Sequence, residues 1–221
     1  MGISRSSIRD WQDHLEPRRL PVTCVRCMDP AASPDSWAYA HLLGLYLGDG
    51  CISSGPRGVY SLRITCCDQY PVLMDECEES LRFIRGGHVG RVRSVGCTDV
   101  KAYSKHWPHL FPQHGPGPKH KRPILLEPWQ RDIVEAQPGR FLRGLFHSDG
   151  CRVTNWTTRP VGGCIKRYEY PRYFFSNASA DIRGLCCWAL NRVRLPWRDV
   201  TQRLGLSCWR SGLRALGAVR C

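Results

Sequence analysis

One octapeptide occurs twice in this chain, and the repeat constrains the fold more than any other feature. Residues 44–51 read G-L-Y-L-G-D-G-C and residues 144–151 read G-L-F-H-S-D-G-C, so the two copies lie 100 residues apart. They hold the only Asp-Gly pairs in the sequence. One Asp-Gly pair is typical of a hairpin turn, but two copies in the same apolar frame indicate an internal repeat.

Each copy is predicted to lie at the end of a helix. Segments 38–48 and 138–148 are apolar at helical spacing, and Gly50 and Gly150 are expected to stop the helices in the left-handed conformation. Small residues four positions apart share one face of each helix: Gly44 with Gly48, and Gly144 with Ser148. Small side chains at this spacing let two backbones approach closely, so we expect the helices to pack together.

The aspartates that follow are not explained by a helix end alone. A carboxylate in the last helical turn faces the negative end of the helix dipole, and two such carboxylates side by side repel each other. A divalent cation removes both penalties. The sequence therefore predicts a metal site at Asp49 and Asp149, with the preceding residues Gly48 and Ser148 beside it.

The pattern L-x-G-L-x-x-x-D-G, at residues 42–50 and 142–150, resembles that of the LAGLIDADG (DOD-type) homing endonucleases. The two copies are similar to the single-chain, two-repeat members, and the resemblance covers residues 38–192. It implies an α+β fold of two pseudo-symmetric αββαββα repeats whose motif helices meet at an interface. For this chain it implies Asp49 and Asp149 as the catalytic pair that binds the divalent metal, Mg²⁺.

The charge balance favours a polyanionic partner. Lysine and arginine number 32 against 19 aspartates and glutamates, which gives a net charge of +13 and an isoelectric point near 9.4. Each neutralised phosphate releases counterions, and arginine is the better bidentate reader of phosphate and guanine. A GC-rich genome would also raise the arginine content. We expect double-stranded DNA as the partner and a monomeric chain.

Thirteen cysteines are present, and the sequence has neither a signal-type apolar region nor an apolar run of about 18 residues. We therefore expect no membrane association, a cytoplasmic location and reduced cysteines. Cys24-x-x-Cys27 is half of a zinc knuckle, with His14 as a candidate third ligand, so Zn²⁺ is a second candidate cofactor. Four further histidines show no regular ligand spacing: His106, His109, His114 and His120.

The N-terminal segment 1–36 is predicted to be a partial helix-turn-helix followed by a proline-rich linker that holds the CxxC pair. Gly2 makes the turn, Ser4 caps the helix, and Ile8 and Trp11 face a core. The first helix of that motif is missing, so we do not expect this segment to read DNA by itself.

The first repeat is predicted to span 37–136. Strand 59–65 alternates, with an apolar face toward the helices and a polar face that offers hydroxyls and a guanidinium for base edges and phosphates. An amphipathic helix at 69–85 ends at Gly86-Gly87 and carries an acidic surface, and strands follow near 88–95 and 97–104. The outward DNA-binding candidates are Ser61, Arg63, Thr65, Arg91, Arg93 and Lys101, with Tyr103 beside them.

A basic loop ends this repeat, with the cluster Lys119-His120-Lys121-Arg122. In the family that the motifs resemble, a lysine after the fourth strand reaches the scissile phosphate, which makes Lys119 or Lys121 a catalytic candidate. Phosphate-backbone contact by a basic loop explains the same residues.

The second repeat is predicted to span 137–192, with a longer hairpin, a strand at 170–177 and a helix at 180–192. Arg172, Phe174 and Ser176 fall on the face that corresponds to Ser61, Arg63 and Thr65, so Arg172 and Ser176 are further DNA-binding candidates. Residues 193–221 form a divergent tail without useful alternation. We therefore expect the second repeat to lack its closing strands. As a result, one edge of its sheet should be exposed, and the tail at 193–221 should be poorly ordered.

The sequence thus predicts a site-specific double-strand DNA endonuclease that holds divalent metal ions on two motif aspartates. Two alternatives stay open: a non-cleaving DNA-binding transcriptional regulator on a degenerate homing-endonuclease fold, and an inactive gene remnant. The helix-turn-helix remnant favours the regulator, whereas retention of both aspartates favours the enzyme. The sequence does not indicate the DNA target.

Overall fold

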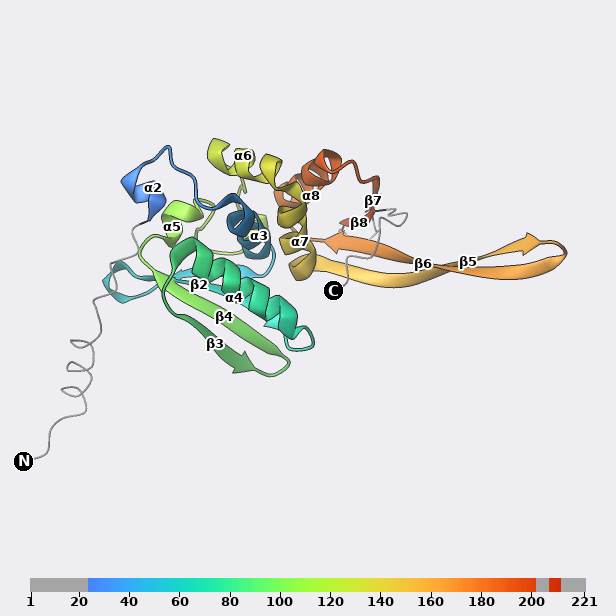
Figure 1. Cartoon of the computed structure of the whole chain (residues 1–221), viewed down its shortest axis with the longest axis horizontal. Coiled ribbons are helices and arrows are strands. Elements are labelled where there is room, and N and C mark those ends of the chain that lie inside the picture. Colours follow the sequence, from blue (N-terminus) through green and yellow to red (C-terminus); the bar gives the residue numbers. More distant parts are fainter. Residues whose placement is uncertain (1–23, 202–206, 212–221) are drawn as a thin grey trace, which may run out of the picture.

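Two four-stranded antiparallel sheets with helices between them form the described part of the chain, residues 24–201 and 207–211 of a computed structural model (Figure 1). The expected helix-turn-helix at 2–11 and the ligand candidate His14 lie outside the described residues. The order of elements repeats the predicted pattern of a motif helix, two strands, a helix and two strands, so the α+β fold with two related halves is confirmed.

The first half contains these elements: α2 (Val25–Met28), α3 (Ser36–Leu47), β1 (Gly50–Ser54), the 3-10 turn η1 (Pro56–Gly58), β2 (Tyr60–Cys67), α4 (Pro71–Arg85), β3 (Val89–Ser94), β4 (Cys97–Ser104) and α5 (Trp107–Leu110). The sheet order is β1-β2-β4-β3. The Asp35 side chain accepts a 2.7 Å hydrogen bond from the Ala38 amide and so caps the start of α3.

The second half follows the 3-10 turn η2 (Lys119–Lys121) and consists of these elements: α6 (Pro128–Ala136), α7 (Pro138–Asp149), β5 (Gly150–Val161), β6 (Cys164–Ser176), α8 (Ala180–Arg192), β7 (Trp197–Thr201) and β8 (Ser207–Ser211). Its sheet order, β5-β6-β8-β7, matches that of the first half. Ser179 caps α8 by accepting from the Ile182 amide at 3.4 Å.

The expectation that the second half lacks its closing strands is wrong. β7 and β8 pair with each other, and β8 pairs with β6 with Phe175 opposite Trp209. Phe175, in the strand predicted at 170–177, is fully buried, so the expectation of an exposed sheet edge is not met here. The sequence did not predict β7 and β8 because these short strands have no clear alternation of apolar and polar residues. Their structure depends instead on pairing within the sheet.

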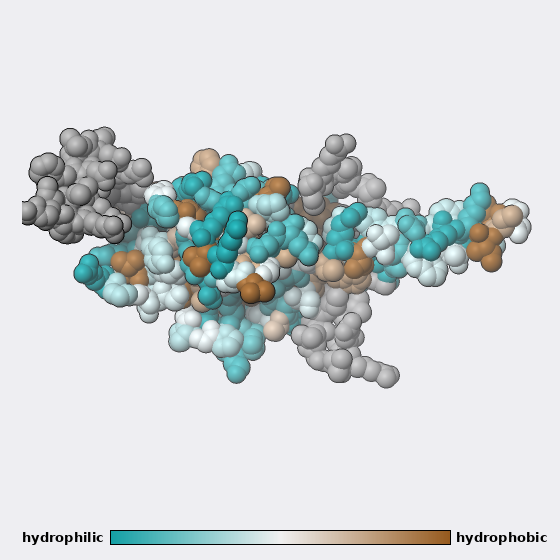
Figure 2. Space-filling model, turned by 90° about the horizontal axis from the view of Figure 1, so that it is seen from below, coloured by the Kyte–Doolittle hydropathy of each residue, from teal (hydrophilic) through white to brown (hydrophobic). Residues whose placement is uncertain are grey.

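A long arm makes the two halves unequal. β5 and β6 contain 12 and 13 residues, against 5 and 8 in β1 and β2. The hairpin extends far from the body of the molecule (Figure 1), and its sides are hydrophilic with an apolar tip (Figure 2). Val161 and Ile165 are exposed at that end.

α3 is the centre of the core. All its residues from Ala38 to Leu47 are buried, because it packs against α7, α4 and α6 at once. α4 covers the first sheet (Figure 1) and has an unexpected buried stripe. Met74, Cys77 and Leu81 are buried, whereas the apolar residues Val72 and Phe83 are 58% and 64% exposed.

Candidate active site

The two motif helices cross where their glycines meet. A Cβ atom on Gly44 would lie 2.9 Å from the Gly144 Cα, and one on Gly144 would lie 2.2 Å from the carbonyl oxygen of His41. A Cβ on Gly48 would lie 2.2 Å from the Ser148 Cβ. No side chain fits at these distances, so the predicted packing of the two helices through small residues is confirmed.

Gly50 and Gly150 are needed for a different reason from the one predicted. Neither is among the positive-φ residues of the described chain, and Gly150 has φ −91°, so they are not left-handed helix stops. A Cβ on Gly50 would lie 2.4 Å from the Tyr46 Cα, and one on Gly150 would lie 2.3 Å from the Phe146 carbonyl oxygen. Each strand begins by passing directly over the helix that precedes it.

This crossing brings the two aspartates together. Asp149 is the last residue of α7, and its Oδ2 lies 3.1 Å from the position that a Cβ on Gly48 would take. Burial raises the pKa of Asp49, and the charge of Asp149 raises it further, while Lys119 lowers it. Burial also raises the pKa of Asp149, against the hydrogen bond from Asn177 and the charge of Lys119. Two partly buried carboxylates thus share one small site.

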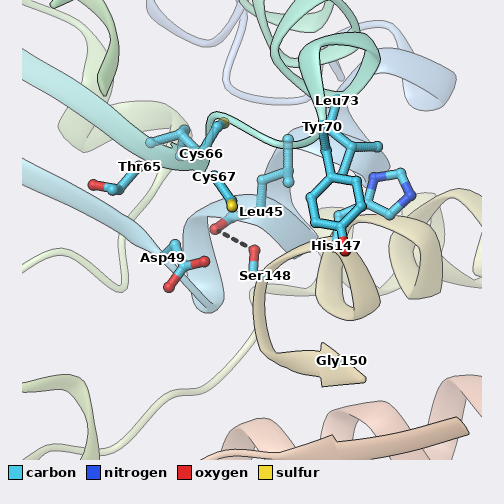
Figure 3. Close-up of a pocket in the computed structure, with 11 residues that line it drawn as sticks. Leu45, Asp49, Thr65, Cys66, Cys67, Tyr70, Leu73, His147, Ser148 and Gly150 are labelled. Carbon is cyan, nitrogen blue, oxygen red and sulfur yellow. Dashed lines mark hydrogen bonds between the residues drawn. The ribbon is translucent and has the colours of Figure 1, made fainter. Parts of the chain in front are cut away.

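Two hollows flank Asp49. One is lined by residues of both motif helices, of β2 and of the start of α4, among them Asp49, Thr65, Tyr70, His147 and Ser148 (Figure 3). The other lies between the end of α3 and the loop of Gly115, Gly117 and Lys119. The Ser148 hydroxyl is turned back to the helices, where it donates to the carbonyl oxygen of Leu45 at 3.4 Å (Figure 3) and lies 3.2 Å from that of Gly144.

Lys119 lies at the end of α3, while Lys121 is exposed on the same turn. The Lys119 ammonium donates to the carbonyl oxygens of Tyr46 at 2.5 Å, Leu47 at 3.0 Å and Gly48 at 2.6 Å. An ammonium has three donors, so all three N–H groups are used. Burial lowers the pKa of Lys119 to about 8, although Asp149 and Asp49 raise it.

Two further residues stabilise this site: Asn177, which the sequence did not indicate, and Arg122, which the sequence indicated only as part of the basic cluster. Asn177 donates to the Asp149 Oδ2 at 2.6 Å, and its own Oδ1 accepts from the Ser179 amide at 2.7 Å, which fixes the amide toward the carboxylate. Arg122 bonds the carbonyl oxygens of the 115–117 loop and thereby shapes the approach to Lys119. Neither contact is visible in a sequence pattern, because both join residues that meet only in the fold.

The polar face of the first sheet contains some of the predicted DNA-binding residues. In the register, Arg63 lies opposite Lys101, and Ser61 lies opposite Tyr103, and opposed residues share a face. Thr65 lies opposite Asp99 on the same face. Asp99 accepts from the Thr65 hydroxyl at 2.8 Å and lies 3.3 Å from the Lys101 Nζ and 3.8 Å from the Arg63 Nη1.

Arg91 and Arg93 do not lie on this polar face, which corrects the prediction. Arg91 is opposite the buried Val100, and Arg93 is opposite the buried Thr98, so both belong to the helix side of the sheet. The Arg91 guanidinium pairs with Asp75 at 2.5 Å and with Glu78 at 2.5 Å. The acidic surface of α4 is thus partly neutralised by a residue that we expected to contact DNA.

The second sheet presents the equivalent face. Cys51 pairs with Arg63 in the first sheet and Cys151 pairs with Phe174 in the second, so Phe174 corresponds to Arg63. Arg172 and Ser176 flank it two residues away on the same face. The Arg172 Nη2 donates to the Tyr170 hydroxyl at 2.6 Å. The predicted correspondence of the two faces is therefore confirmed by the register.

Two helices pair between two antiparallel sheets, with Asp149 at the end of α7 and Asp49 just after the end of α3, and this fold is similar to that of solved homing endonuclease structures. A structure of an I-DmoI variant in complex with its nicked target DNA and manganese is similar to this chain, with 14% identity, a TM-score of 0.51, and coverage of 81% of this chain and 90% of that one. A second I-DmoI variant in complex with target DNA has 16% identity, a TM-score of 0.50 and coverage of 81% and 88%. I-DmoI is a homing endonuclease. No protein-family profile and no curated protein matches the sequence.

At this level of identity the likeness shows the fold and not the activity. None of the helices in the described ranges is long and apolar enough to cross a membrane.

Proposed function

We propose that this chain is a metal-dependent endonuclease that cleaves both strands of double-stranded DNA at a specific site. The observation that carries the proposal is the pair Asp49 and Asp149, brought to one site by two helices whose glycines allow backbone contact. The fold supports it, since the similar I-DmoI structures are complexes with target DNA and manganese. The net charge of +13 supports a DNA partner.

The donor set fits a hard divalent cation. Carboxylates and backbone carbonyl oxygens are the ligands that Mg²⁺ prefers, and Asp49 and Asp149 offer the carboxylates. The carbonyl oxygens of Gly48 and Ser148 are the adjacent candidates, although that of Gly48 accepts from Lys119. Burial, and then the charge of Asp149, raise the pKa of Asp49, so it costs free energy to ionise both carboxylates here, and a bound cation removes that cost. When bound, Mg²⁺ lowers the pKa of a water and stabilises the leaving oxygen.

The chain's own residues orient this site. Asn177 holds the Asp149 carboxylate at 2.6 Å, and Lys119 fixes the last carbonyl groups of α3, next to Asp49. Because all three Lys119 donors are engaged, we assign Lys119 the role of a positioning residue in this state rather than a direct phosphate contact. Lys121, which is exposed, is free to contact the phosphate backbone as part of the basic loop.

The two polar sheet faces supply the DNA contacts in this proposal. Arg63, Lys101 and Ser61 offer base-edge or phosphate contacts from the first sheet, and Arg172 and Ser176 offer them from the second. Thr65 of the first sheet is also proposed to contact DNA. Asp99 restrains Arg63, Lys101 and Thr65 in one network, so these side chains are partly ordered before DNA arrives.

The test uses a plasmid library with randomised inserts, incubated with Mg²⁺ and sequenced at the cut ends. We expect one family of related cut sites with the wild type, and none with Asp49→Asn/Asp149→Asn or with chelator. A wild type that binds DNA without cutting it under these conditions would instead support the non-cleaving regulator. A chain that neither binds nor cuts would support the inactive remnant.

A further inference from the structure

A second group of ligand-type residues lies away from the aspartate pair. Cys24 immediately precedes α2 and Cys27 lies within it, while His106 immediately precedes α5 and His109 lies within it. The two short helices are in contact. One ligand atom from each residue, two thiol sulfurs and two ring nitrogens, lies within 4.8 Å of all the others.

The distances agree with one tetrahedral zinc ion. Bond lengths of about 2.3 Å for Zn–S and about 2.0–2.1 Å for Zn–N place neighbouring ligand atoms roughly 3.3–3.8 Å apart. The Cys27 Sγ lies 3.1 Å from the His106 Nδ1 and 2.8 Å from the His109 Nδ1. Every other pair lies within 4.8 Å, so a movement of less than about 1 Å by each ligand atom, within the reach of side-chain rotation, brings the cluster to the coordinated geometry.

The protein backbone holds both ligand pairs without help from a metal. The amides of Cys27 and Met28 donate to the Cys24 carbonyl oxygen at 2.9 and 3.1 Å, which closes the turn of the first pair. The His106 amide donates to the Ser104 Oγ at 3.0 Å. Trp107, between the two histidines, is fully buried and donates to the Ala102 carbonyl oxygen at 2.9 Å.

We propose that Cys24, Cys27, His106 and His109 bind one Zn²⁺ as a structural site. Two thiolates and two imidazoles form a closed set of four protein ligands, which leaves no open position for catalysis. Thiolates disfavour Mg²⁺, and none of the four residues lines either hollow at Asp49. The site is therefore chemically and spatially separate from the proposed catalytic metals.

The ion would join the two ends of the first half. Cys27 and His106 are 79 residues apart, and the chain between them contains α3 and the whole first sheet. A crosslink over a long loop stabilises mainly by restricting the unfolded chain. The sequence pattern missed the site because each ligand pair is half of a zinc motif and the halves meet only through the contact of α2 with α5.

The test begins with the metal content of the purified full chain. We expect about one zinc per chain in the wild type, and a large loss in Cys27→Ser/His109→Ala. Two matched controls replace exposed residues of the same types outside the cluster, Cys164→Ser and His88→Ala, and both should retain the zinc. Asp49→Asn/Asp149→Asn should also retain it, so failure of the endonuclease proposal leaves this result unaffected.

A titration of the metal-free wild type with Co²⁺ keeps the proposal testable if the ligand variants do not fold. We expect one equivalent of Co²⁺ to give the strong visible absorption of a tetrahedral site together with sulfur-to-cobalt charge-transfer bands. Addition of Zn²⁺, but not Mg²⁺, should abolish both and raise the melting temperature. The proposal is overturned by a wild type without zinc or cobalt bands, by a Cys24–Cys27 disulfide, or by ligand variants that keep the full zinc content.

Discussion

At Gly144, the absence of a side chain allows the two motif helices to approach closely enough to bring Asp49 and Asp149 together. Because a Cβ there would lie 2.2 Å from the His41 carbonyl oxygen, Gly144→Ala must push the motif helices apart, and we expect a loss of about 1–3 kcal/mol in the free energy of unfolding. Gly184→Ala, also within a helix, would place its Cβ more than 4 Å from every described atom outside its chain neighbours and the nearby backbone of its own helix. This change should be neutral or stabilising by up to about 1 kcal/mol. Chemical denaturation measures both, and equal losses would contradict this account.

Lys119 gives a second prediction at the residue scale. Lys119→Met leaves the last carbonyl groups of α3 without their donor, and we expect this to destabilise the chain by about 1–3 kcal/mol and to lower cleavage. Lys121→Met, at an exposed position, should leave the free energy of unfolding unchanged and lower cleavage only through weaker DNA binding. Thermal unfolding and plasmid cleavage, measured on both variants, test whether Lys119 acts as a positioning residue. A Lys119→Met variant with full stability but no cleavage would instead indicate that Lys119 makes a direct catalytic contact.

At the scale of the elements, the interface of α3 with α4 and α7 contains a buried histidine. His41 is fully buried, and its Nδ1 lies 2.9 Å from the Ser80 Oγ. Its Nε2 has no hydrogen-bond partner among the residues that the structure describes. Burial, together with the charges of Arg140, His147 and Arg143 on α7, lowers the pKa of His41 from 6.5 to about 3. The Glu76 carboxylate of α4 lies 4.0 Å away.

This depressed pKa makes the interface sensitive to acid. Between pH 6.5 and about 3 the unfolded chain binds a proton at this histidine that the folded chain does not, so stability falls as the pH falls through this range. His41→Gln can keep the hydrogen bond to Ser80 but cannot titrate, and we expect its melting temperature to depend less on pH. His88→Gln, at an exposed position, should retain the wild-type slope. Parallel slopes for all three proteins would refute the assignment.

The elements also show which parts of the structure the sequence could predict. The motif helices, the strands near 88–95 and 97–104, and the helix at 180–192 follow from local periodicity and capping, and the structure confirms them. The face of Arg91, the strands β7 and β8, and the partners of Asp149 depend on pairing between distant segments. Local periodicity does not contain that information, because a strand shifted by one residue turns every side chain to the other face.

At the scale of the whole molecule, a comparison of Arg63 and Arg91 distinguishes arginines that bind DNA from arginines that stabilise the fold. Arg63 lies on the polar face with Lys101, whereas Arg91 forms ion pairs with Asp75 and Glu78 of α4. We expect Arg63→Ala to weaken DNA binding by about 1–3 kcal/mol and to change the preferred site if the guanidinium contacts a base. Arg91→Ala should leave the affinity unchanged. Binding measured over a range of salt concentrations tests this, since affinity should fall steeply with salt.

The long β5–β6 arm has a consequence for symmetry. Twelve or thirteen residues per strand, at about 3.3 Å each, give a reach of roughly 40 Å, which the first half does not match with its shorter β1 and β2. If both sheet faces follow one duplex, the two sides of the cut are covered unequally. The preferred site should then be non-palindromic and longer on the side of the arm, and footprinting should show protection that is off-centre from the cut. Deletion of residues 156–168 should shorten the protected segment on that side alone.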